Sequence, residues 1–126
     1  MSRDSFWLAS GFVAALLLIG VPYWSVPYAQ ANLPSSLVGA GLFVLTALAV
    51  LLALAGVARL RAVLATMALC PAAAVALRVL ADGVADPTSH NLWPLEIVIA
   101  LVLGAGAVLP ALIAGLVARR FRRKAV

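Results

Sequence analysis

The sequence predicts an all-α integral membrane protein: one four-helix bundle made of two antiparallel transmembrane hairpins. Its composition is the first reason. Of the 126 residues, 66% are hydrophobic and 10% are charged, whereas soluble domains are about half apolar and a quarter charged. The mean hydropathy is +1.17. The second reason is the division of the apolar residues into four long stretches, with almost all charges outside them: residues 6–24, 37–58, 62–80 and 95–118.

Each stretch has about the 20 residues that a helix needs to cross the hydrocarbon of a bilayer. Together they account for nearly the whole chain, so we expect a single transmembrane domain over residues 1–126. The first stretch also resembles a secretory signal peptide, with Arg3 before an apolar core and an Ala-Gln-Ala sequence at residues 29–31. The long aromatic segment between core and cleavage sequence favours a retained span instead. Pro22 and Pro27 predict that its helix ends near Tyr23.

The connections between the stretches predict how the spans are joined. Only Arg59-Leu60-Arg61 separates the second stretch from the third, which requires an antiparallel hairpin. Pro71 should kink the third span. We expect that span to stop at Asp82-Gly83 and the fourth to begin at Pro94, a residue suited to the first turn of a helix.

The distribution of charge predicts the orientation in the membrane. Basic residues in short loops favour the cytoplasmic side, and eight of the nine basic residues would lie on one side: Arg3, Arg59, Arg61, Arg119, Arg120, Arg122, Arg123 and Lys124. Three of the four acids, Asp82, Asp86 and Glu96, would lie on the other side. We therefore expect a multi-pass protein of a bacterial-type inner (plasma) membrane with both termini cytoplasmic. Nucleic acid is not an expected partner, because no folded basic domain would carry it.

Two features of the fourth span indicate contacts with helices and lipids. Small residues recur at helical spacing and predict a surface for close helix packing: Gly104, Ala107, Ala111 and Gly115. The span is followed by a basic tail, Arg119, Arg120, Arg122, Arg123 and Lys124, which either binds anionic lipid or fixes the orientation of the chain.

Arg78 is the one basic residue inside a predicted span, near its outer end. A charge at membrane depth is costly, and its long side chain can reach the interface. Asp82 lies four residues further along the same helix face, and Glu96 lies just inside the fourth span. The sequence therefore predicts an ion pair of Arg78 with Asp82 or Glu96, serving either structure or a ligand or proton site.

The outer segment before the fourth span holds most of the polar side chains that could bind a ligand or partner: Asp86, Ser89, His90, Asn91, Trp93 and Glu96. Polar residues on a loop between rigid elements favour recognition, although a self-capping turn has the same composition. His90 and the nearby acids match no metal-ligand spacing, so no metal or cofactor is expected. Cys70 has no second cysteine to pair with, and we expect it to fill space.

Three functional classes follow. The favoured class is an accessory or structural subunit that contacts other membrane subunits, or its own copies, through helix packing and the outer loop. A transporter or channel component is the second class. Such proteins line their path with polar residues, and mid-depth here offers Thr46, Thr66 and Cys70. The third class is a membrane enzyme or lipid-modifying protein using the His90 loop, which is less expected because no nucleophile and base are suitably spaced.

Overall fold

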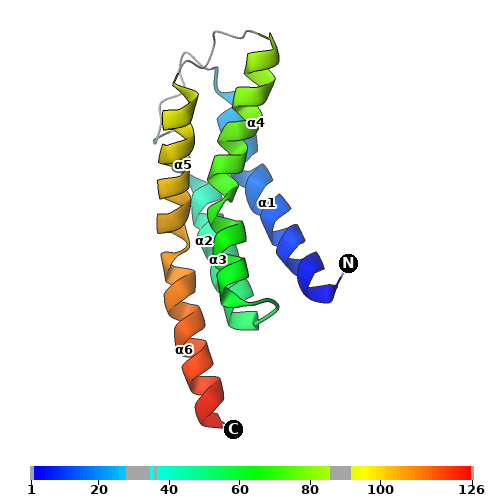
Figure 1. Cartoon of the computed structure of the whole chain (residues 1–126), viewed down its shortest axis with the longest axis vertical. Coiled ribbons are helices and arrows are strands. Elements are labelled where there is room, and N and C mark those ends of the chain that lie inside the picture. Colours follow the sequence, from blue (N-terminus) through cyan, green and yellow to red (C-terminus); the bar gives the residue numbers. More distant parts are fainter. Residues whose placement is uncertain (1, 28–34, 36, 86–91, 126) are drawn as a thin grey trace.

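The computed structural model describes residues 2–27, 35, 37–85 and 92–125, and all regular secondary structure in these ranges is helical. Six helices follow one another: α1 (Arg3–Ser25), α2 (Ala40–Ala55), α3 (Leu60–Ala68), α4 (Cys70–Ala85), α5 (Trp93–Ala107) and α6 (Leu109–Ala125). A single residue separates α3 from α4 and α5 from α6. These two pairs therefore form long rods, as Figure 1 shows, and the described chain has four helical segments.

Three of the four segments are long and apolar enough to cross a membrane: α1, the α3–α4 rod (Leu60–Ala85) and the α5–α6 rod (Trp93–Ala125). Both rods are longer than the predicted stretches 62–80 and 95–118. The fourth segment, α2, has 16 residues and is shorter than the predicted stretch 37–58. The extended backbone of Gly39 precedes α2, and Gly56 ends it in the left-handed conformation (φ 66°), where glycine has no steric penalty.

The first helix ends close to its predicted end near Tyr23: α1 continues through Pro22 and ends at Ser25, two residues further on. A proline this close to the end removes one helical hydrogen bond, that to the Leu18 carbonyl, and leaves the last turn able to form. The Ser25 hydroxyl donates to the Val21 carbonyl at 2.6 Å and supports that turn.

Proline also interrupts both long rods. The predicted kink beside Pro71 is present: α3 ends at Ala68 and α4 begins at Cys70. The α5–α6 rod is broken in the same way at Val108, two residues before Pro110. The predicted stop at Asp82-Gly83 is wrong, because α4 runs on to Ala85. A glycine in a helix costs about 1 kcal/mol relative to alanine, which is too little by itself to end a helix at that position.

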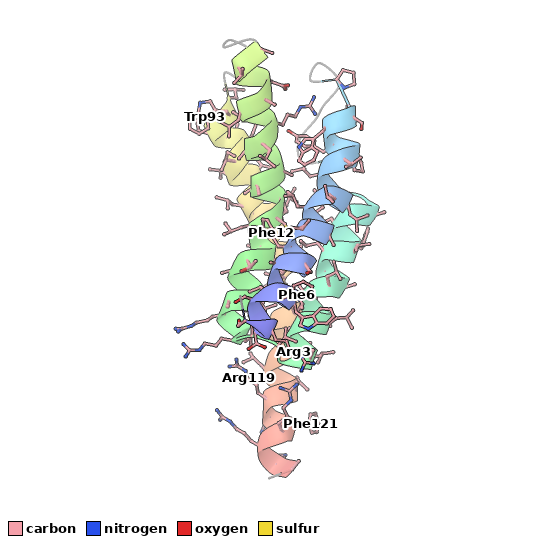
Figure 2. The ribbon with its side chains drawn as sticks, turned by 90° about the vertical axis from the view of Figure 1, so that its right-hand side faces the viewer. Arg3, Phe6, Phe12, Trp93, Arg119 and Phe121 are labelled. Atoms are coloured by element: carbon pink, nitrogen blue, oxygen red, sulfur yellow. The ribbon has the colours of Figure 1, made fainter. Side chains whose placement is uncertain are left out.

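The four segments pack as a ring. α2 lies mainly against α1 and α6, while α4 lies mainly against α1 and α5. The chain's N-terminal end, the α2–α3 connection and the C-terminal end of α6 lie toward the same end of the elongated molecule (Figure 1). We call this the basic end, because it carries Arg3, Arg59, Arg61 and the basic residues of 119–124. In Figure 2, Arg3 and Arg119 lie toward that end and Trp93 lies toward the opposite end.

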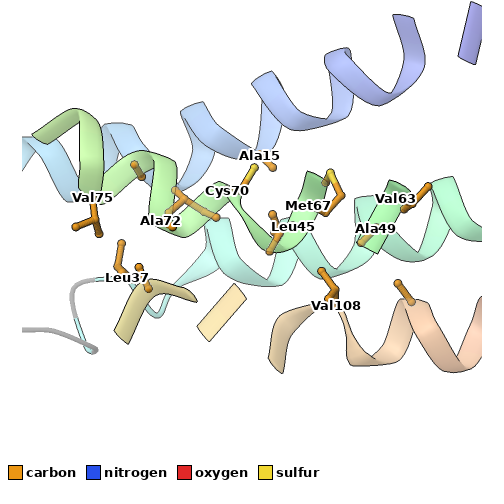
Figure 3. Close-up of a cluster of buried hydrophobic side chains, with 14 of the residues drawn as sticks. Ala15, Leu37, Leu45, Ala49, Val63, Met67, Cys70, Ala72, Val75 and Val108 are labelled. Carbon is orange, nitrogen blue, oxygen red and sulfur yellow. The ribbon is translucent and has the colours of Figure 1, made fainter. Parts of the chain in front are cut away.

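The core is apolar and built largely from small side chains, which lets the helix backbones approach closely. Ala15, Ala49, Ala74, Ala100 and Ala111 are fully buried. Larger side chains fill the spaces between them, including Leu45, Val63 and Met67 (Figure 3).

Two glycines mark the closest approaches between backbones. A Cβ atom on Gly41 of α2 would overlap the Leu18 carbonyl oxygen of α1, which is the carbonyl that Pro22 leaves without its helical partner. A Cβ atom on Gly104 of α5 would overlap the Ala68 carbonyl oxygen, at the break between α3 and α4. Both glycines therefore face a carbonyl beside a proline-disrupted turn, and weak Cα–H···O contacts suit such positions.

The predicted packing stripe of the fourth segment lies on the inner side of the rod. Gly104, Ala111 and Gly115 are buried, and Ala107 is partly buried. Gly115 faces Leu60 at the start of α3, and a Cβ atom there would lie 2.5 Å from Leu60 Cδ1.

Replacing Gly104 with alanine should destabilise the fold by about 1 to 3 kcal/mol, because the added methyl group collides with backbone that cannot move aside easily. Gly106, two residues away in the same helix, has open space around its Cα. Gly106→Ala is the matched control and should be neutral or stabilising. Equilibrium unfolding of both variants in mixed detergent micelles measures the difference. Equal stabilities would contradict the close approach of α5 to Ala68.

Candidate functional site

Arg78 is the centre of the most polar site in the described structure. It lies on α4 near the end opposite the basic end, and its residue surface is only 6% exposed. Its Nη1 donates to the Tyr23 carbonyl at 2.6 Å, and its Nη2 donates to the Val26 carbonyl at 2.5 Å. These carbonyls belong to the last turn of α1 and the residue that follows it. The planar guanidinium therefore caps the C-terminus of another helix, where the helix dipole favours a positive charge.

The ion pair between Arg78 and Asp82 is present, with Nε 3.4 Å from Oδ2 along one face of α4. Asp82 remains partly exposed, so this contact is the weaker part of the site. Glu96, the other acid predicted to lie near Arg78, is in the first turn of α5 and is partly buried.

Two aromatic residues of α1 complete the clamp between α1 and α4. The Arg78 guanidinium lies over the Tyr23 ring, 4.8 Å from its centroid, and Tyr23 is almost fully buried. The indole Nε1 of Trp24 donates to the Ala74 carbonyl of α4 at 2.9 Å. These contacts of Tyr23 and Trp24 with α4 were not predicted from the sequence. The sequence does hold one indication of these contacts. Tyr23 and Trp24 directly follow Pro22, and a helix end leaves backbone carbonyls that need hydrogen-bond donors.

A cavity of about 410 Å³ lies beside this clamp, lined by Trp24, Leu77, Arg78, Ala81 and Asp82. Its polar wall consists of Arg78 and Asp82, and its other walls are apolar. Because the guanidinium already donates to two carbonyls and to Asp82, its first role is to hold α1 against α4.

A second arginine acts in the same way at the basic end. Arg122 of α6 donates from Nη2 to the Leu54 carbonyl in the last turn of α2. Gly56 makes room for it, since a Cβ atom there would lie 2.6 Å from Arg122 Nη1. This bond of Arg122 was not predicted from its place in the basic tail. Arg122 is exposed, as are the other basic tail residues: Arg119, Arg120, Arg123 and Lys124.

Two of the three predicted mid-depth polar side chains, Thr46 and Cys70, donate to backbone carbonyls of other helices. The Thr46 hydroxyl lies 2.9 Å from the Ala107 carbonyl oxygen, beside the α5–α6 break, and 3.2 Å from the Leu42 carbonyl oxygen. The Cys70 thiol donates to the Phe12 carbonyl at 3.4 Å. Cys70 therefore links α4 to α1 as well as filling space.

The structure describes only part of the predicted outer loop. Asp86, Ser89, His90 and Asn91 lie outside the described residues. Trp93 begins α5 with about half of its surface exposed. Within the described ranges, no group of three His, Cys, Asp or Glu side chains is placed to hold a metal ion. No known protein family matches this chain, and no curated protein or solved structure is similar to it.

Arg78→Ala should lower the free energy of unfolding by about 3 kcal/mol, because it leaves two carbonyls of α1 without their donor. Arg78→Lys should fall between this variant and the original chain, since one ammonium group cannot reproduce the planar fork. Asp82→Asn is the control and should cost under about 1 kcal/mol, because the ion pair is partly solvated. Thermal and denaturant unfolding in mild detergent test the series. A loss in Asp82→Asn equal to that in Arg78→Ala would assign the stability to the ion pair instead.

Proposed function

We propose that this protein is a four-span accessory or structural subunit of a bacterial-type inner membrane, which acts through contacts with other membrane proteins rather than by moving a solute. The observation that carries the proposal is the use of polar groups at mid-depth. Thr46 and Cys70 each donate to a backbone carbonyl of a neighbouring helix, inside a core of alanine, leucine and valine. Polar groups engaged in this way lock helices together, whereas a transport path needs them available to a solute.

The proposed topology places both termini and the α2–α3 connection in the cytoplasm. It is supported by the gathering of eight basic residues at the basic end, while Asp82 and Glu96 lie near the opposite end. α2 would be the fourth span of the bundle. Its 16 residues cover about 24 Å at 1.5 Å per residue. The non-helical residues 37–39, with Leu37 buried, would continue its path toward the outer surface.

The proposed contact surface includes the outer segment 86–96 and the exposed apolar side chains beside it. Trp93 is the described aromatic residue of that segment, and an exposed tryptophan gives a large contact area with a polar N–H group. The segment is joined to α4 at one end and α5 at the other, so a partner would contact a loop whose two ends are fixed by helices.

Reporter domains fused after residue 126 and inserted near Ser89 should report opposite sides of the membrane. A reporter inserted between α2 and α3, at Ala58, should agree with the C-terminal fusion. The physical reason is that all the short basic segments resist translocation together. A C-terminal fusion found outside, or agreement between the Ser89 and C-terminal reporters, would contradict the topology.

Replacing His90 and Trp93 together by alanine should remove a co-purifying subunit at fixed stoichiometry, while membrane insertion and thermal stability stay unchanged. The matched control is Phe121→Ala, an exposed aromatic residue at the basic end. The measurement is affinity purification in mild detergent with quantitative mass spectrometry of the bound subunit. If the double variant keeps the subunit, segment 86–96 is a connector. If the original chain binds no subunit and no second copy, the accessory function is wrong.

A further inference from the structure

A groove lies between α1 and α2 at the basic end. Its volume is about 610 Å³, and its lining is almost entirely apolar. The α1 wall includes Trp7 and Ala14, and the α2 wall includes Leu48 and Leu51. The floor lies where Gly11 meets Leu52, since a Cβ atom on Gly11 would be 2.9 Å from Leu52 Cδ1. Toward its N-terminus α1 diverges from the other helices (Figure 1), and this divergence leaves the groove open.

The size of the groove suits a single hydrocarbon chain. From Arg3 to Ala14 it follows eleven residues of α1, or about 16 Å at 1.5 Å per residue. That is about half of the roughly 30 Å hydrocarbon thickness, the depth that one leaflet supplies. Its volume falls in the range of small-molecule sites, about 300 to 1,000 Å³. A helix about 10 Å wide and 15 Å long would need roughly 1,200 Å³, so the groove is too small to enclose a partner helix.

The charge at the mouth of the groove favours an anionic head group. Arg3 lines the groove at its end, and among the described residues it makes no hydrogen bond or ion pair. Arg122, bound to the Leu54 carbonyl, adds a second positive charge near the α2 side of the mouth. Trp7 lines the same end, and tryptophan favours the level of the lipid head groups. The acid nearest in sequence, Asp4, is in the first turn of α1 and does not line the groove.

We propose that this groove binds one anionic glycerophospholipid of the leaflet at the basic end, with an acyl chain between α1 and α2 and the phosphate at Arg3. The inference rests on the proposed placement of the chain in a membrane. Lipid bound here fills the space between α1 and α2 on the N-terminal side of the Gly11–Leu52 contact, and it would tie the N-terminal half of α1 to the bundle. None of the basic tail residues of α6 lines the groove, although Arg122 lies near its mouth.

The test uses the full chain in nanodiscs of equal parts phosphatidylglycerol and phosphatidylcholine. Lipid retained on the released protein is counted by native mass spectrometry. Arg3→Gln removes the head-group contact, and Arg61→Gln is its control, since Arg61 is exposed at the same end and does not line the groove. Ala14→Trp fills the groove. Ala9→Trp is its control, because Ala9 is exposed on α1 away from the lining.

The original chain should retain phosphatidylglycerol over phosphatidylcholine by about fivefold, the discrimination expected from one cation near the membrane surface. Arg3→Gln should bring the retained ratio close to the bulk ratio, and Ala14→Trp should reduce retention of both lipids. Both control variants should behave as the original chain does. Circular dichroism and resistance to alkaline extraction from membranes show that every variant compared is folded and inserted.

Three results would overturn the lipid site. Retention unchanged in Ala14→Trp would show that the chain is not held in the groove. An equal effect of Arg61→Gln and Arg3→Gln would show only diffuse attraction to the basic end. A dimer of the original chain that Ala14→Trp dissociates, without a change in lipid retention, would assign the groove to a second copy. Release of the original chain by alkali is a different failure, because it would contradict the membrane placement itself.

Discussion

In apolar surroundings a backbone carbonyl that lacks its helical N–H partner needs another donor, and this need joins the helices of the protein. Arg78 of α4 supplies donors to Tyr23 and Val26 at the end of α1. Arg122 of α6 serves Leu54 at the end of α2, and Thr46 of α2 serves Ala107 at the α5–α6 break. Every one of these bonds links two different segments at a helix end or a break. The ring of segments is thus held by backbone requirements, while the small apolar side chains allow the approach.

The sequence predicts the helical class, the break at Pro71 and the gathering of basic residues toward one end, because each follows from composition or from one residue's chemistry. Helix bounds are less predictable. Pro22 and Gly83 do not decide by themselves where α1 and α4 end, because α1 continues three residues beyond Pro22 and α4 two residues beyond Gly83. Arg78 could be singled out because a charge within an apolar stretch is conspicuous. Its carbonyl partners on α1 could not, since nothing local to Tyr23 or Val26 indicates which helix will lie beside them.

Arg78 and Arg122, the two arginines that cap helix ends, differ in how much positive charge is accessible to a ligand beside them. Arg78 is almost fully buried and engaged by α1, so the cavity beside it offers a ligand mainly the partly exposed Asp82. Arg122 is engaged as well, but it lies among exposed basic residues whose charges face the surroundings. A polar ligand would therefore find more available charge at the basic end. Both arginines hold the end of another helix, but only at the basic end do exposed charges surround the cap.

The shortness of α2 has a consequence for the membrane around the protein. α2 begins only at Ala40, and Val38 and Gly39 before it are exposed with non-helical backbone. Hydrocarbon cannot satisfy unpaired backbone groups, so in the proposed membrane placement water and lipid head groups would reach deeper beside α2 than beside the two long rods. The hydrophobic belt would then be of unequal height around the protein. Such a mismatch costs fractions of a kcal/mol per ångström, and it would favour one rotation of the protein relative to its neighbours.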